Sequence, residues 1–169
     1  MPKFMPIYGP VVADTFYVNG ALAGRDVGIT LPEVTPATAS VQAMGTLDLP
    51  IWQNIENMEL AITKIGVDMG LRKMIKPEPL TMEARWVQTV TDANGMTKNV
   101  GCKAFAKGIP NKIPGIGVAL GEASESECTS TVTRYQLIVD GQEVFLIDRL
   151  AGIIRIDGVD YAGGLNSLL

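Results

Sequence analysis

The sequence predicts a mainly β protein with a single domain over residues 1–169, built as an antiparallel β-sandwich or barrel with one short flanking α-helix. Two observations favour this class. Apolar and polar residues alternate along several short segments, which is the period of a half-buried strand. Asn-Gly and Asp-Gly pairs lie between some of these segments, and such pairs are typical of tight hairpin turns. The chain is also long enough to bury a substantial core.

The centre of the chain carries the clearest strand pattern. Residues 80–91 alternate between an apolar face that includes Leu80 and Met82 and a face of threonines and charged residues. Residues 96–107 alternate in the same way, and the polar segment 92–95 between them has turn chemistry. We therefore predict a β-hairpin here, within a total of about seven or eight strands.

Further strands are predicted on both sides of this hairpin. Near the N-terminus, residues 15–18 and 27–31 flank the Asn19-Gly20 turn signal as a first hairpin. The other predicted strands cover residues 55–65, 129–139, 143–148 and 153–156, with turns at Asp140-Gly141 and Asp157-Gly158.

One helix is predicted, over residues 66–76. Its apolar residues recur at helical spacing, as in Val67 and Leu71, and Arg72, Lys73 and Lys76 lie toward its C-terminal end, where the helix dipole favours cations. Asp68 suits the first turn, and Pro77 ends the helix.

Three segments lack a clear period. Residues 1–14 carry three prolines and are expected to form an extended arm, and residues 108–126 are expected to form a glycine-rich loop. Residues 32–54 form a long connection, and connections of this length are usually functional or disordered. Because this one is apolar, we expect it to pack on a neighbouring copy through Met44, Leu47, Leu49, Ile51 and Trp52.

The composition also favours assembly. Hydrophobic residues make up 47% of the chain and charged residues only 19%, so apolar surface is expected to remain for a partner to cover. No apolar run is long enough to cross a membrane, and the prolines of the N-terminus interrupt any signal-peptide core. We expect the chain to mature in the cytoplasm, with Cys102 and Cys128 as reduced core thiols.

Composition argues against catalysis and against nucleic-acid binding. The chain has no histidine, which removes the commonest general base and metal ligand, and its net charge is −4 rather than basic. The glycines from Gly115 to Gly121 loosely match a dinucleotide fingerprint, but prolines precede them and a Glu/Ser run follows, so the strand–turn–helix context is missing. No catalytic, cofactor-binding or metal-binding residue is predicted.

Charged residues form two biased stretches. Glu122, Glu125 and Glu127 form an acidic group, and the basic group is Lys98, Lys103, Lys107 and Lys112. The acidic group is interpreted either as a solvated face or as an electrostatic element that lines a channel or faces a basic patch on another copy.

The order of elements resembles the major tail tube protein family of contractile-tailed bacteriophages. In the second half, the resemblance lies in SECTSTVTRYQLIVDGQEVFLIDRLAGIIRIDGVDY, with a threonine-rich strand, the Asp140-Gly141 turn and the later Gly158-Val159-Asp160. In the first half it lies in FYVNGALAGRDVGITLPEVTPATASVQAMG, an aromatic strand and Asn-Gly turn that lead to Leu31-Pro32 and a long loop. The resemblance covers roughly residues 15–161.

The resemblance implies hexameric rings that stack into a hollow tube inside a contractile sheath. It implies a tape-measure protein in the lumen, baseplate and terminator proteins at the ends, and passage of DNA without specific binding. The expected location is the virion tail, after assembly in the bacterial host cytoplasm. Alternatives are the tube of a headless contractile bacteriocin or injection system, and a monomeric β-sandwich module that binds carbohydrate or peptide.

Within this picture, the charged groups become candidate contacts. We expect Lys103, Lys107 and Lys112 of one subunit to meet Glu122 and Glu125 of another, where complementary charge would set register. Glu59 and Glu127 are predicted to face the lumen, where acidic groups repel DNA phosphates.

Overall fold

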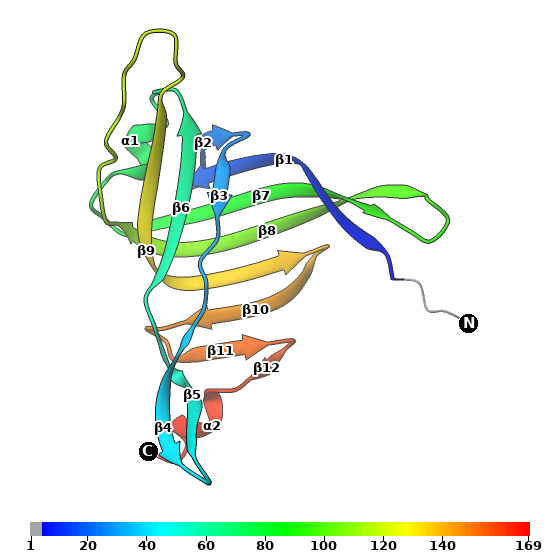
Figure 1. Cartoon of the computed structure of the whole chain (residues 1–169), viewed down its shortest axis with the longest axis vertical. Helices are drawn as coiled ribbons and strands as arrows, with labels where there is room; N and C mark the ends of the chain where they lie inside the picture. Colours follow the sequence, from blue (N-terminus) through cyan, green and yellow to red (C-terminus); the bar gives the residue numbers. More distant parts are fainter. Residues whose placement is uncertain (1–4) are drawn as a thin grey trace.

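The computed structural model describes residues 5–169 and shows a mainly β, antiparallel fold, as predicted (Figure 1). Within that range the chain has more strands than expected, and its two helices are each a single turn. The strands are β1 (Ile7–Val18), β2 (Ala21–Arg25), β3 (Gly28–Thr30), β4 (Pro36–Gln42), β5 (Thr46–Ile55), β6 (Met58–Ile65), β7 (Leu80–Thr91), β8 (Thr97–Pro110), β9 (Glu125–Val139), β10 (Gln142–Asp148), β11 (Ile153–Ile156) and β12 (Val159–Asp160); the helices are α1 (Leu71–Met74) and α2 (Gly163–Asn166).

Most strands join one ten-stranded sheet. Its main path runs β12-β11-β10-β9-β8-β7-β1-β2, and β6 branches from β9 and carries β3 on its other side. β4 and β5 pair only with each other, as a separate two-stranded sheet.

The long strand β9 belongs both to the main path of the sheet and to the branch formed by β6 and β3. Its first half pairs with β6, and its second half pairs with β8 and β10 (Figure 1). The register between β8 and β9 shifts after Lys107, next to Gly108. A Cβ atom on Gly108 would lie 2.4 Å from the carbonyl oxygen of Thr131, so this close approach of two backbones requires glycine.

The core gathers alternate side chains from β1, β6, β7, β8 and β9. Phe16, Met58, Leu80 and Val132 are almost completely buried in it. The two cysteines, Cys102 and Cys128, are also buried and free, as predicted. Burial raises the pKa of both thiols, so neither is poised as a thiolate. 

The predicted central hairpin is confirmed. β7 and β8 pair from Leu80 opposite Gly108 to Thr91 opposite Thr97. The Asp92 carboxylate accepts hydrogen bonds from two backbone N–H groups of the turn, at 2.8 and 2.9 Å. β8 runs on to Pro110, so the expected loop at 108–126 begins and ends as strand and is open only over residues 111–124.

The pairing predicted for the first hairpin is wrong. Across the Asn19-Gly20 turn, β1 pairs with β2, whereas β3, which holds most of the segment 27–31, pairs with β6. The expected arm at residues 1–14 also contributes to the sheet from Ile7 onward, because β1 pairs with β7 along its length. Residues 1–4 of that arm lie outside the described residues.

The helix predicted over residues 66–76 is wrong in length, since α1 covers only Leu71–Met74. Gly66 has a positive φ of 77°, which breaks the helical path, and Val67 is 57% exposed rather than packed. Helix α2 was not predicted and lies in the C-terminal tail.

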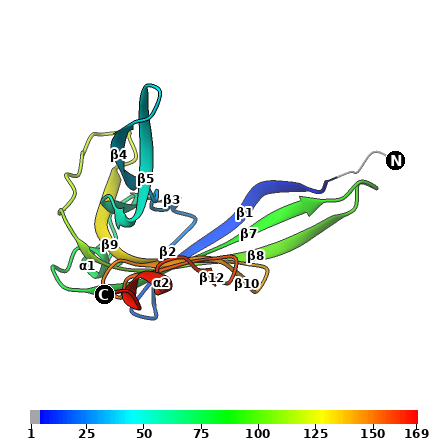
Figure 2. The same ribbon diagram turned by 90° about the horizontal axis from the view of Figure 1, so that it is seen from below.

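Two segments stand out from the sheet. Figure 2 shows the β4–β5 hairpin projecting away from the main sheet, and the β7–β8 turn extending in another direction. In Figure 1 the 111–124 loop forms one end of the long axis, and the β4–β5 hairpin with α2 forms the other.

Candidate assembly surfaces

The β4–β5 hairpin has one apolar and one polar face. Cross-strand partners place Ala37 with Ile51, Ala39 with Leu49 and Val41 with Leu47. Residues in register point to the same side of a two-stranded sheet, so these six side chains form a single stripe, called here the apolar hairpin face. The opposite face carries polar pairs such as Ser40 and Asp48.

Nothing in the described part of the chain covers the apolar hairpin face. Val41, Leu47 and Leu49 are each about half exposed, at 45, 47 and 45%. An isolated two-stranded sheet is marginally stable in water and normally needs a packing partner. The long connection expected at residues 32–54 therefore contains a strand pair, and one face of that pair is available to another molecule.

The structure separates the predicted contact residues of this segment. Leu47, Leu49 and Ile51 share the apolar hairpin face. Met44 lies in the turn with a φ of 54° and is fully exposed. Trp52 follows Ile51 and lies at the base of the hairpin, 39% exposed, where it borders a pocket.

A second apolar surface lies on the 111–124 loop. Ile113, Val118 and Leu120 are 75, 88 and 105% exposed, while Pro114 is buried and anchors the loop. A Cβ atom added at Gly115 or Gly117 would meet no atom within 4 Å, so no close approach of another segment requires glycine at either position.

The acidic residues predicted for the lumen lie on one face of the β6–β9 pair. Glu59 is opposite Thr131, and Glu127 is opposite Thr63. Glu125 lies on the same face, at the first residue of β9. This acidic face also carries Asn111, whose side-chain amide donates a hydrogen bond of 3.1 Å to Glu59.

Basic residues occupy the continuation of this surface beyond the bend in β9. Lys103 and Lys107 project from β8, and Lys107 is directly opposite Arg134 of β9. Arg85 lies opposite Lys103 on β7 and contacts Glu83 and the ring of Tyr17. Arg134 was not predicted, because the bend that places it beside the lysines is not visible in the sequence.

Within one chain, the predicted lysine and glutamate sets meet at one point among the described residues. The Lys112 ammonium lies 3.5 Å from the carboxylate of Glu127, and both side chains are about half exposed. Lys103, Lys107, Glu122 and Glu125 form no ion pair with residues 5–169. Their charges are therefore available to other molecules.

The burial of Lys64 was not predicted from the sequence. Lys64 is 5% exposed and donates hydrogen bonds to both carboxylate oxygens of Asp68, at 2.7 and 2.8 Å, and to the carbonyl oxygen of Ala23 at 2.9 Å. The Lys64 hydrogen bond is the main reason that the pKa of Asp68 is lowered. This contact ties the segment before α1 to β2. The sequence signal was the strand period, which continues from Met58 and Ile62 to Lys64.

Tyr135 is a buried titratable group in the core. Burial raises the pKa of Tyr135 to about 12, and its ring stacks edge-on against Phe145 with centroids 4.9 Å apart. Across residues 5–169, no group of three or more His, Cys, Asp or Glu side chains is arranged to hold a metal ion. Neither helix of the described chain has the length and apolar character that a membrane crossing needs.

A family model described as phage tail tube protein FII matches residues 13–168, which is nearly the whole chain. The match begins within β1 and ends after α2, so it includes both hairpins and the long loop. No curated protein matches the sequence.

Proposed function

Because the chain belongs to the phage tail tube protein FII family, and is thus a structural component of a phage tail, we propose that it forms the inner tube of a contractile tail. Six copies form a ring, and rings stack into a conduit for DNA. The proposed partners are further copies of the chain, an outer sheath, a tape-measure protein in the lumen, and baseplate and terminator proteins at the ends. Assembly takes place in the host cytoplasm.

The apolar hairpin face carries this proposal. It is a stripe of aliphatic side chains on a projecting two-stranded sheet, and the described chain leaves it open to solvent. A neighbouring subunit of a ring would bury it, which would stabilise both the hairpin and the assembly. The main path of the sheet also ends at the short strand β12, and pairing between copies there would remove an edge.

Purified protein should assemble without cofactors. Size-exclusion chromatography with light scattering should show oligomers at micromolar concentration, and negative-stain microscopy should show sixfold rings or tubes. A chain that stays monomeric as its concentration rises, and forms no tube with tail proteins, would contradict the proposal. That outcome would favour a monomeric binding module.

We place Glu59 and Glu127, on the acidic face of β6 and β9, toward the lumen. Carboxylates there would repel DNA phosphates and keep a passing strand from binding. Charge reversal by Glu59→Lys and Glu127→Lys, both on exposed positions, should leave tube formation intact but make tubes retain short DNA in low salt. Tubes that retain no DNA after reversal would place this face elsewhere.

A further inference from the structure

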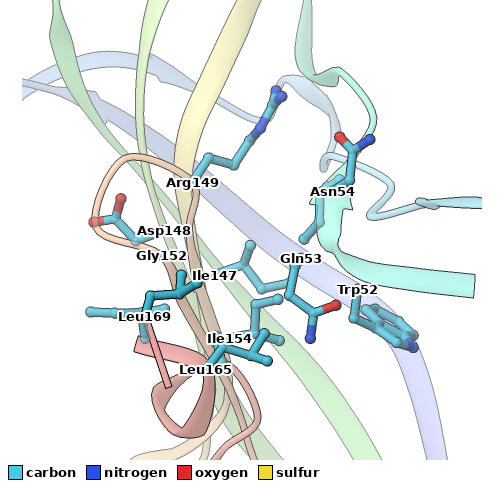
Figure 3. Close-up of a pocket in the computed structure, with 13 residues that line it drawn as sticks. Trp52, Gln53, Asn54, Ile147, Asp148, Arg149, Gly152, Ile154, Leu165 and Leu169 are labelled. Atoms are coloured by element: carbon cyan, nitrogen blue, oxygen red, sulfur yellow. The ribbon is translucent and has the colours of Figure 1, made fainter. Parts of the chain in front are cut away.

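The base of the β4–β5 hairpin borders a pocket that the chain itself leaves empty. The pocket has a volume of about 360 Å³ and lies between the end of β5, the turn from β10 to β11, and α2. Its apolar lining includes Trp52, Ile55, Ile147, Ile153, Ile154 and Leu165. Figure 3 shows Ile154 and Leu165 close together, with Gln53 and Trp52 beside them. Pockets of this size hold small apolar groups well.

The rim of this pocket carries a cation. Arg149 belongs to the β10–β11 turn, and its side chain extends away from Ile154 and Leu165 (Figure 3). The turn is fixed because the Asp148 carboxylate accepts hydrogen bonds from the backbone N–H groups of Leu150 and Ala151, both at 3.0 Å. Arg149 makes no ion pair with any residue between 5 and 169.

The 111–124 loop has the complementary character. Four aliphatic side chains project from it, at Ile113, Ile116, Val118 and Leu120, and the last two are almost fully exposed. Glu122 follows them on a turn in which its N–H donates to the carbonyl oxygen of Ala119 at 3.3 Å. Glu122 is exposed and, like Arg149, has no ion-pair partner among the described residues.

The loop and the pocket lie toward opposite ends of the longest axis of the molecule (Figure 1). A protruding apolar segment at one end and an apolar pocket at the other make a head-to-tail contact, which each added copy can repeat. The charges agree with this direction, since Glu122 would approach Arg149 at the pocket rim.

We infer that aliphatic side chains of residues 113–120 of one copy insert into the pocket of a second copy, with Glu122 paired to Arg149 rather than to the lysines expected from the sequence. This inference rests on the proposed self-assembly and adds to it the segment and the receptor of one contact. It is a heterologous contact, distinct from any contact made by the apolar hairpin face. The tip of the loop supplies the apolar side chains, and the turn before β11 supplies the cation.

Cysteine cross-linking between copies tests the inference directly. One preparation carries Leu120→Cys and another carries Gln53→Cys, and the two are mixed during assembly and then oxidised. A disulfide-linked dimer that needs both preparations is expected. Background should be low, because the native Cys102 and Cys128 are 2 and 3% exposed. Each preparation oxidised alone is the matched control and should give little dimer.

A charge exchange provides the second test. Glu122→Arg and Arg149→Glu should each raise the protein concentration needed for assembly, by about threefold to tenfold for a desolvated pair. Combining both changes in one chain should restore most of the loss. Both side chains are exposed, so the thermal unfolding of the protomer should not change.

The outcomes separate this inference from the proposed function. If wild-type protein assembles, but the mixed preparations give no specific dimer and the charge exchange has no effect, the loop–pocket contact is wrong and the tube proposal stands. If wild-type protein never assembles, the proposed function fails, and this inference fails with it.

Discussion

Two leucines in comparable strands have opposite surroundings. Leu60 lies in the alternating pattern of β6 and is 2% exposed, because β6 faces the core shared with β1, β7 and β9. Leu49 lies in the alternating pattern of β5 and is 45% exposed, because β5 has only β4 as a neighbour. The comparison teaches that the same period-two pattern serves two purposes here: one apolar face is buried by the chain, and the other is left for a further molecule.

Truncating the buried leucine should have the largest effect on the fold. Leu60→Ala removes well-packed methyl groups from the core and should lower the free energy of unfolding by about 2–5 kcal/mol. Chemical denaturation of unassembled protein would measure this loss. Leu49→Ala makes the same chemical change and serves as the control, with little effect on protomer unfolding. Equal losses in both variants would mean that the hairpin face is part of the fold.

Changing the exposed leucine should act on assembly instead. Leu49→Asp places a charge in the middle of the apolar hairpin face, and we expect assembly to weaken by about 2 kcal/mol or more, as at an interface hot spot. Sedimentation of assembled protein against concentration would measure it.

Trp52→Ala sharpens the same test, because Trp52 does not share the stripe of Leu49 and Ile51. We expect it also to weaken assembly by about 2 kcal/mol or more while the protomer stays folded. An assembly defect in the Leu49 variant alone would place the partner on the apolar hairpin face. A lower melting temperature with normal assembly would make Trp52 a residue of the fold.

The buried half of the comparison was readable from sequence. For the exposed half, the sequence indicated the apolar residues but not the strand pair that carries them. The β7–β8 hairpin was predicted because its alternation is long and its Asp92 turn is a strong signal. The β4–β5 hairpin alternates as well, but Pro36 and Pro50 fall within its strands. Proline is tolerated there because each strand has a neighbour on one side only, a circumstance that the sequence does not reveal.

The sequence identified most charged residues of these surfaces, but not how the residues are arranged in space. Glu59 and Glu127 share a face because β6 and β9 pair in register, and their role in the lumen stays a prediction. Arg134 lies opposite Lys107 because β9 pairs with β8 in a register that shifts at this point. Long-range pairing of this kind depends on the packing of distant segments, and local pattern cannot supply it.

Charges that find no partner within the chain should act on assembly and leave the fold unchanged. We predict that Lys103 and Lys107 of one copy approach Glu125 of another, each exposed pair contributing about 0–1 kcal/mol, with repetition around a ring adding to the total. Added salt should shorten tubes, because such pairs are screened over about 8 Å at physiological ionic strength. Glu125→Lys should shorten them as well, and reversing both lysines should partly restore their length. If tube length responds to neither salt nor charge reversal, apolar contacts alone hold the stacked rings together.

An ion pair formed within the chain should affect the stability of the protomer and not assembly. Its effect should be the smallest of those predicted here. Arg155 donates hydrogen bonds to both carboxylate oxygens of Glu143, at 2.6 and 2.9 Å, and Gln136 donates a third at 2.6 Å. The Arg155 hydrogen bond is the main reason that the pKa of Glu143 lies below its ordinary value of 4.5.

Because the folded pKa of Glu143 is depressed, the pair stabilises the fold above pH 4.5, and this contribution disappears as the pH falls through the folded pKa. Glu143→Gln should therefore unfold slightly more easily than wild type at neutral pH, and the difference should shrink below pH 4.5. Thermal melts of unassembled protein across this range would measure it, while tube length at neutral pH should not change. A difference that persists unchanged at low pH would show that the variant acts through packing or through its hydrogen bond to Gln136. Shortened tubes would mean that Glu143 also contacts another copy.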